Sequence, residues 1–394
     1  MERSGFYRGK LGPGGMNVSS ITDFVEHVPF TTKAELLSDR LTFPPFGSNL
    51  TRPLGEYRRF CQTSGTTSGQ PMAWLDTPDS WAELLKCWQR VFRAAGLCPG
   101  VDRLFFAFSF GPFLGFWTAF EAAASDFMVL PGGGLSSQAR LEMMARYGVT
   151  ALCCTPTYAL RLGEMLGMNG APAAANLAVR SIIVAGEPGG SIPAVRERIS
   201  TLWGGARVFD HHGMTETGPV SFELLERPGE LVVIRDAYFA EVINPTNGME
   251  VSEGECGELV LTTLERLSCP LLRYRTGDWV RKRRSRGSVV LEGGVLGRLD
   301  EMAVVRGVNI YPSAIEAVVR QFPDIREFLV LQRKQDAMDE IEVLVELSAD
   351  GTQEVVSRLA ARLRDTFSLR IPVRRVEPGS LPAHDFKSRR WQKG

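Results

Sequence analysis

The chain has 394 residues, 44% of them hydrophobic and 23% charged, and this size and average composition predict a globular protein of two domains. Lys+Arg and Asp+Glu balance at 45 each, which excludes a bulk electrostatic attraction to nucleic acid or to an anionic membrane. No apolar run approaches the roughly 20 residues of a membrane helix, and no secretory signal opens the chain. Seven scattered cysteines without a CxxC pair favour reduced thiols. We therefore expect a soluble, cytoplasmic protein, with a size that favours an enzyme.

In chain order, the first distinctive segment is TSGTTSGQP (63–71). Its glycines permit left-handed backbone, so that N–H groups can point into one concavity, and its hydroxyls add donors. These groups could hold a polyphosphate, although the GK[ST] ending of a Walker A loop is missing. Taken alone, the segment is better interpreted as a flexible surface loop.

A helix is predicted next, because TPDSWAELLKCWQRVFRAAG (77–96) has apolar residues at helical spacing, with Thr77 as cap, Pro78 at the first position and Gly96 at the end. Apolar runs that end in Gly or Pro then alternate with helical stretches such as LSSQARLEMMARYG (135–148). The runs are DRLFFAFSF, FMVLPGGG, VTALCCTP and VRSIIVAGEPGG. This alternation predicts α/β layers around a largely parallel sheet, with ligands at the carboxyl ends of its strands.

From about residue 230, short and closely spaced strands predict antiparallel or barrel-like structure. The basic run VRKRRSRGS (280–288) is expected to be a solvent-facing hairpin there, since no aromatic residues interleave it as in a nucleic-acid patch. Past Arg298, helices opening near Pro312 and over QEVVSRLAARLRDTF (353–367) predict a smaller unit. We expect an α/β fold with a large domain of layered sheets, helices and a β-barrel-like subregion (1–297) and a small, mobile α+β domain (298–394).

The whole series of motifs resembles the adenylate-forming superfamily of acyl-CoA synthetases, adenylation domains and luciferases, and within it the phenylacetate-CoA ligase group. The resemblance runs from VPFTTKAELLSDR (28–40) almost to the C-terminus. In chain order, its motifs are TSGTTSGQP, TPTYALRLGEML, AGEPGG, HHGMTETGP, YRTGDWV, GRLDEMAVVRGVNIYPSAIE and LPAHDFKSRR. Any one of them is weak, but the full series in this order is specific.

The resemblance implies a site for Mg·ATP. In the loop at 63–71, the phosphates would be held by Thr63, Ser64, Gly65, Thr66, Thr67, Ser68 and Gly69. The adenine would lie against the AGEPGG turn, at Gly186, Glu187 and Pro188. In HHGMTETGP, His212 would stack on adenine, with Gly213 and Met214 beside the nucleotide, Thr215 at the α-phosphate and Glu216 helping to hold Mg²⁺.

Further positions are implied closer to the C-terminus. Asp278 would bind the ribose, and Arg298 would be a second ribose or phosphate contact. Asp300 falls on the hinge about which the small domain swings between two half-reactions, and RGVNIYPSAIE (306–316) would then face the thiol acceptor. Lys387 is implied as the catalytic lysine. A turn-forming role for Asp278 and surface roles for Arg298 and Lys387 are the structural alternatives.

The acid is expected in a mostly apolar pocket, which suits an aryl acid. Its candidate residues are aromatic or small and follow the ends of predicted strands: Phe108, Phe110, Phe113, Tyr158, Ala185 and His211. At least half of them could instead belong to the core. The pair His211-His212 might indicate a transition-metal site, but no further His or Cys lies nearby in sequence.

The resemblance thus implies an ATP-dependent acid–CoA ligase that works through an acyl adenylate and uses ATP, Mg²⁺ and CoA, as a monomer or homodimer without nucleic-acid or membrane partners. Two rivals stay open: an enzyme that passes the acid to a carrier-protein thiol or an amine, and a non-catalytic nucleotide-binding relative. The chain departs from the group by the extra Ser68, by Gln70 in place of a common Lys and by Phe386 in place of Gly. These departures suggest a divergent member, with a role in biosynthesis.

Overall fold

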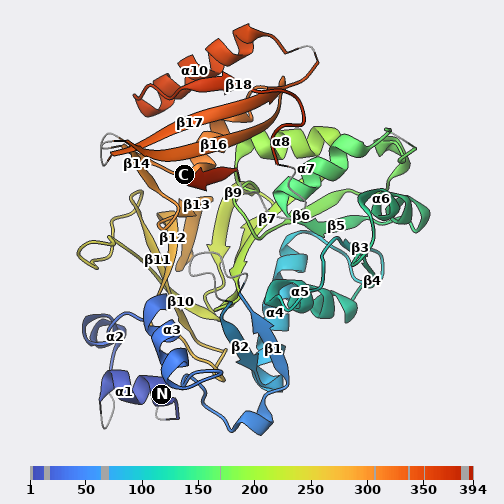
Figure 1. Cartoon of the computed structure of the whole chain (residues 1–394). Coiled ribbons are helices and arrows are strands. Elements are labelled where there is room, and N and C mark those ends of the chain that lie inside the picture. Colours follow the sequence, from blue (N-terminus) through green and yellow to red (C-terminus); the bar gives the residue numbers. More distant parts are fainter. Residues whose placement is uncertain are drawn as a thin grey trace.

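The computed structural model describes residues 3–12, 18–63, 71–168, 170–305, 308–335, 338–349, 351–382 and 390–393. Most of the predicted phosphate loop lies outside the described residues: Ser64, Gly65, Thr66, Thr67, Ser68, Gly69 and Gln70. The same holds for Phe386 and Lys387. Figure 1 shows the N-terminal helices and the C-terminal unit at opposite ends of the molecule, with a long sheet between them.

One half of this sheet is parallel, as predicted. Its strands are β3 (Arg103–Phe106), β4 (Met128–Pro131), β5 (Ala151–Cys154), β6 (Ser181–Val184) and β7 (Arg207–Met214). One face packs on α4 (Pro78–Ala94) and α5 (Leu114–Ala124). The other packs on α6 (Ser137–Arg146), α7 (Pro156–Met165) and α8 (Pro193–Leu202). Helices on both faces explain why β3, β4, β5 and β6 are almost entirely apolar.

The antiparallel half continues the same sheet beyond β7. Its strands are β8 (Gly218–Leu224), β9 (Arg227–Val233), β10 (Tyr238–Ile243), β11 (Cys256–Thr263), β12 (Tyr274–Ser285) and β13 (Ser288–Arg298). The strand order is β10-β11-β12-β13-β9-β8-β7-β6-β5-β3-β4. The expected barrel-like subregion is therefore the antiparallel half of one eleven-stranded sheet, and β7 joins it to the parallel half (Figure 1).

The N-terminal segment packs beside this antiparallel half. It contains α1 (Gly5–Leu11), α2 (Ile21–His27), α3 (Lys33–Thr42), a short 3-10 helix (Leu54–Glu56) and the hairpin of β1 (Arg59–Gln62) and β2 (Ala73–Asp76). A capping box between Thr32 and Glu35 fixes the start of α3. Leu36 of α3 packs with Trp74 of β2 and Tyr274 of β12. This core holds the hairpin that flanks the predicted phosphate loop against the sheet.

The C-terminal unit has a core of its own. It contains β14 (Ala303–Val305), β15 (Val308–Ile310), α9 (Pro312–Val319), β16 (Ile325–Gln335), β17 (Met338–Leu347), α10 (Gln353–Phe367), β18 (Val373–Arg375) and β19 (Trp391–Lys393). The buried residues of this core all come from 303–371. The domain boundary near 297–300 stays a prediction. In Figure 1 the unit, in orange and red, sits over α7 and α8.

Local signals in the sequence explain several of these boundaries. Thr77 accepts a hydrogen bond from the Ser80 N–H at the start of α4, and Gly96 follows the helix with a φ of 73°. The basic run at 280–288 forms the β12–β13 hairpin, and its arginines are exposed, as predicted, while Lys282 is buried and pairs with Glu250. A 3-10 turn (Ala174–Asn176) completes the secondary structure of the described chain.

The cysteines and the helices bear on two expectations from the composition. All seven cysteines lie in the described part of the chain, and all are free thiols. Within that part, none of the helices combines the length and the apolar character needed to cross a membrane.

Candidate active site

The hairpin of β7 and β8 carries the residues of the HHGMTETGP motif. Gly213 lies where a Cβ atom would stand 2.8 Å from the carbonyl oxygen of Gly218, so the close approach of the two strands requires glycine. Thr215 and Glu216 form the turn between the strands, and the Met214 side chain packs against the core under α3. The motif is thus a tight hairpin end, and it presents His212, Thr215 and Glu216 at the carboxyl end of β7.

A chain of polar contacts joins this hairpin to β12 and β13. His212 Nε2 lies 3.1 Å from Asp278 Oδ2, and Arg298 donates to Asp278 Oδ1 at 2.9 Å. Since a carboxylate only accepts hydrogen bonds, the His212 proton sits on Nε2. Three residues predicted for the nucleotide site, from three different strands, are therefore brought together.

Asp278 is buried but stays ionised. Burial alone would raise the pKa of this carboxyl group, but the hydrogen bonds from His212 and Arg298 and the positive charge of Arg298 outweigh burial and lower its pKa. Each carboxylate oxygen has two acceptor positions, and His212 and Arg298 take one on each. Among the described residues, no other side chain takes the second acceptor position of either oxygen, which suits the two hydroxyls of a ribose.

Glu216 has a cationic neighbour that the sequence motifs did not identify. Lys33, in the first turn of α3, places its Nζ 3.7 Å from Glu216 Oε1. The Glu216 side chain is 10% exposed and that of Lys33 is 30% exposed, so this pair is only partly screened by solvent. Lys33 stands within VPFTTKAELLSDR, but no spacing rule links that segment to a residue 183 positions later.

Sequence reasoning also missed the support beneath the Thr215–Glu216 turn. Arg266 donates to the carbonyl oxygens of Thr215 and Glu216 at 2.8 and 2.9 Å. It also makes a two-pronged contact with Asp76 at the end of β2, at 2.7 and 2.6 Å. The side chains of this pair are 2% and 1% exposed. Burial opposes the charge of Arg266, but Asp76 outweighs it and raises the pKa of Arg266. The pair fixes the turn relative to the hairpin that flanks the predicted phosphate loop.

The ends of that loop are closed by Thr63. Its hydroxyl accepts from the Met72 N–H at 2.9 Å, and its own N–H donates to the Met72 carbonyl at 3.0 Å. Thr63 is therefore used in holding the base of the loop. The roles predicted for residues 64–69, and for Lys387, concern residues that are not described and stay predictions.

The predicted adenine turn is shaped by glycines and by Asp210. Gly186 has a φ of 92°, and a Cβ on Gly190 would collide with the Asp210 carboxylate. Asp210 accepts from the Ser191 hydroxyl at 2.5 Å and from the His211 N–H at 2.9 Å. Asp210 thus fixes the turn against β7. Glu187 accepts from the N–H of Thr157 at 2.8 Å, so its carboxylate is directed to the start of α7, and Pro188 is half-buried.

The buried carboxyl group of Asp210 should make the free energy of unfolding depend on pH. Burial raises its pKa from the ordinary value of 3.8 to about 6. Because the folded-state pKa is the higher one, its contribution to the free energy of unfolding is complete below pH 4 and is lost as the pH rises through 6. Asp210→Asn does not titrate, so the variant should gain on the order of 3 kcal/mol relative to the wild type between pH 4 and 7. Guanidinium unfolding at both pH values measures this, and a difference that does not change with pH would contradict it.

Three of the residues predicted for the acid lie in one aromatic cluster. The Phe108 ring stacks on Phe116 at 4.3 Å, Phe110 lies 6.1 Å from Phe108, and Phe113 lies 5.6 Å from Phe116. Strand β3 ends at Phe106, earlier than the apolar run suggested, and Phe110 has a φ of 50°. A bulky residue in left-handed backbone is a strained feature, of the kind that gathers at functional sites.

His211 lies on the same side of the sheet as this aromatic cluster, whereas Tyr158 lies on the other side. The His211 ring lies 4.3 Å from Trp88 of α4, and Nδ1 lies 2.8 Å from the carbonyl oxygen of Ser221, so Nδ1 carries the proton. Burial lowers the pKa of His211 to about 3, so the ring is neutral at pH 7. Tyr158 packs on the opposite face, where its hydroxyl lies 3.0 Å from Ser137. Ala185 is half-buried at the end of β6. Trp88 could not be predicted as a neighbour of this site, because it belongs to none of the sequence motifs.

The predicted hinge lies at the end of β13. Arg298 donates to Asp300 at 3.1 Å, and Lys393 of β19 donates to the Asp300 carbonyl at the same distance. Tyr311 stacks on Trp279 of β12 and fills the space over Gly297. These contacts join the C-terminal unit to the sheet on both sides of Asp300, while the hinge role itself stays a prediction. Of the segment 306–316, Arg306 and Gly307 lie outside the described residues.

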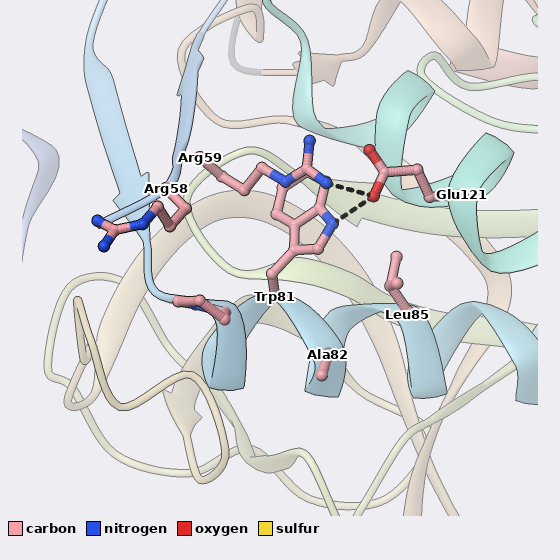
Figure 2. A pocket seen from close by; sticks show the side chains of 7 residues that line it. Arg58, Arg59, Trp81, Ala82, Leu85 and Glu121 are labelled. Carbon is pink, nitrogen blue, oxygen red and sulfur yellow. Dashed lines mark hydrogen bonds and ion pairs between the residues drawn. The ribbon is translucent and has the colours of Figure 1, made fainter. Parts of the chain in front are cut away.

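A surface cavity of about 400 Å³ lies away from all of these groups. Figure 2 shows Arg59 over the ring of Trp81, with Glu121 accepting hydrogen bonds from both side chains. Arg58 points away from them (Figure 2). None of the described residues predicted for ATP or for the acid lines this cavity. Arg59 and Trp81 both donate to Glu121, so these three polar groups of the cavity satisfy one another.

Two family models match successive parts of the chain. The sequence pattern of the family described as AMP-binding enzyme matches residues 60–264, and that of the AMP-binding enzyme C-terminal domain matches residues 307–392. The phenylacetate-coenzyme A ligase of Thermus thermophilus is 29% identical over 97% of this chain and 90% of that protein. The enzyme of the same name from Escherichia coli is 28% identical over 97% of this chain and 88% of its own length.

Solved structures of a 2-hydroxyisobutyryl-CoA ligase distinguish two arrangements. Its postadenylation state matches with a TM-score of 0.91 at 28% identity, over 100% of this chain and 86% of that one. Its thioesterification state, with CoA, matches over the same shares with a TM-score of 0.71 at 29% identity. The described chain therefore has its two parts arranged as in the postadenylation state.

Proposed function

This chain belongs to the AMP-binding enzyme family, and from that premise we propose that it is a ligase for aryl acids. It is an ATP-dependent acid–CoA ligase that works through an acyl adenylate. In the first half-reaction a carboxylate oxygen attacks the α-phosphorus of ATP, and the bond to pyrophosphate breaks. In the second, the CoA thiolate attacks the acyl carbon, and the bond between this carbon and the AMP oxygen breaks.

The observation that carries the residue assignment is the buried contact of His212, Asp278 and Arg298 beside the Thr215–Glu216 turn. In this proposal Asp278 accepts from the ribose hydroxyls through its two remaining acceptor positions. Its hydrogen bond fixes the His212 ring that stacks on adenine, and Thr215 donates to the α-phosphate. Because His212 and Arg298 keep the buried Asp278 ionised, its carboxylate can accept hydrogen bonds from a nucleotide.

Glu216 fits the role of magnesium ligand. One protein carboxylate combined with phosphate oxygens is a donor set that Mg²⁺ takes. When bound there, Mg²⁺ supplies positive charge to the phosphates. Lys33 adds a fixed positive charge beside Glu216, which offsets the absence of a lysine at Gln70. Lys387 is the second cation that acts on the transition state.

An aryl acid is favoured by the aromatic cluster around Phe108 and by the neutral ring of His211. Aromatic rings gain from edge and offset contacts with such a cluster, and a neutral imidazole does not oppose an apolar substrate. The 2-hydroxyisobutyryl-CoA ligase that matches this fold carries a small aliphatic acid in its name, so the two classes of acid need a direct comparison.

That comparison is acid-dependent exchange of pyrophosphate into ATP, measured across phenylacetate, benzoates, 2-hydroxyisobutyrate, fatty acids and amino acids. We expect exchange with arylacetates or benzoates to exceed exchange with 2-hydroxyisobutyrate by roughly a hundredfold, the discrimination of a pocket shaped for a different group. Preferred exchange with an aliphatic acid would overturn the aryl assignment. No exchange with any acid would contradict the ligase itself.

A further inference from the structure

Arg390 is the residue of the described C-terminal tail that reaches the large domain. Within its own unit it makes a two-pronged contact with Glu327 of β16, at 2.6 and 3.0 Å, and lies 3.4 Å from Glu316 of α9. Its side chain is 7% exposed. Its backbone carbonyl accepts from Val330, which starts the pairing of β19 with β16. Two carboxylates and a strand therefore fix the position of Arg390 in the C-terminal unit.

The same guanidinium crosses to the large domain. Arg390 Nη1 donates to the hydroxyl of Thr157 at 3.2 Å. Thr157 stands in the first turn of α7 and is 6% exposed, and its N–H donates to Glu187 of the adenine turn. Burial opposes the charge of Arg390, but Glu327, Glu316 and Glu187 outweigh it and raise the pKa of Arg390. Thr157 and Glu187 thus form a polar site on the large domain for the guanidinium of Arg390, which belongs to the C-terminal unit.

The structure that contains this contact resembles one of the two arrangements of the solved ligase. The chain matches the postadenylation state of the solved ligase with a TM-score of 0.91, against 0.71 for the thioesterification state. Thr157 belongs to α7 of the large domain and Arg390 precedes β19 of the C-terminal unit, so their contact depends on how these two parts are placed. A hydrogen bond between them can therefore stabilise one arrangement relative to the other. Such a contact raises the population of the arrangement that contains it.

We infer that Thr157 is a positioning residue for the adenylation half-reaction, whose hydroxyl seats Arg390 and so places the C-terminal tail. The inference rests on the proposed function, in which Lys387 acts on the transition state of adenylation. The Thr157–Arg390 hydrogen bond holds the C-terminal unit on the large domain in this arrangement. The thioester-forming half-reaction does not need this contact.

The test compares Thr157→Val, which keeps the shape and removes the hydroxyl, with Thr157→Ser, which keeps the hydroxyl. Two rates are measured: pyrophosphate exchange with the preferred acid of the panel, and thioester formation from its synthetic acyl adenylate and CoA. Thr157→Val should lower exchange roughly tenfold, as expected for a lost hydrogen bond to a charged group, and should leave thioester formation unchanged. Thr157→Ser should retain exchange. In an Arg390→Lys background, Thr157→Val should cause no further loss.

Equal exchange in the wild type, Thr157→Val and Thr157→Ser would overturn the inference and leave the proposed function standing. A parallel loss of both half-reactions in Thr157→Val would also overturn it, because that is the result of a purely structural role. Absence of exchange in the wild type would contradict the proposed function, and the inference would fall with it.

Discussion

Replacing Lys387 by alanine should lower the rate of acyl-adenylate formation by roughly a hundredfold to a thousandfold, the usual effect of removing a group that stabilises developing charge. Negative charge builds on the phosphoryl oxygens as the carboxylate attacks, and a lysine ammonium is a compact charge that can meet it. The measurement is pyrophosphate exchange into ATP, with thioester formation from a supplied acyl adenylate as the second half-reaction. The second rate should be unchanged.

Lys86→Ala is the control for this prediction, because Lys86 lies exposed on α4 and contacts only Glu83 on its own helix face. It should leave both rates unchanged. Near-normal exchange in Lys387→Ala would show that the assignment of Lys387 is wrong. Equal loss of both half-reactions would point to damage to the fold in place of a role in adenylation.

The largest effect on stability is expected from Arg266→Met. The change leaves the Asp76 carboxylate buried without its partner, which should lower the free energy of unfolding by about 3–5 kcal/mol. It also releases the carbonyl oxygens of Thr215 and Glu216, so adenylation should fall as well. Denaturant unfolding and pyrophosphate exchange measure the two effects. The exposed pair of Arg59 and Glu121 is a matched control, and Arg59→Met should cost less than about 1 kcal/mol.

The double variant Arg266→Met/Asp76→Leu separates the two roles of this pair. Removing both charges removes the unpaired carboxylate, so much of the lost stability should return. Adenylation should not return, because nothing then holds the Thr215–Glu216 turn. Recovery of both properties together would contradict the positioning role of Arg266, and recovery of neither would contradict the explanation of the stability loss.

The order and type of the main elements could be predicted because local signals agree with the fold. The apolar runs ending in Gly or Pro became β3 to β6, and QEVVSRLAARLRDTF became α10. The continuity of the sheet could not be predicted, since it depends on β7 pairing with β6 on one side and β8 on the other. Periodicity identifies a strand but not its partners.

Residues of the candidate site could be predicted when they belong to a sequence motif. His212, Asp278 and Arg298 come together, as the resemblance implied. Lys33 and Arg266 were missed, because their partners are distant in sequence and a single Lys or Arg carries no local signal. Tyr158 was placed with the acid residues, but its helix α7 packs on the opposite face of the sheet from Phe108. Contacts between elements, unlike motifs, are set by tertiary packing.

The central claim, that the acid is activated as an acyl adenylate, is tested most directly by following its oxygen atoms. The enzyme is incubated with ATP, CoA and an acid labelled with ¹⁸O in both carboxylate positions, and the nucleotide products are analysed by mass spectrometry. The proposed chemistry leaves one carboxylate oxygen on phosphorus when the thioester forms, so AMP should carry one ¹⁸O atom and pyrophosphate none. Unlabelled AMP, or ADP with labelled phosphate, would contradict it.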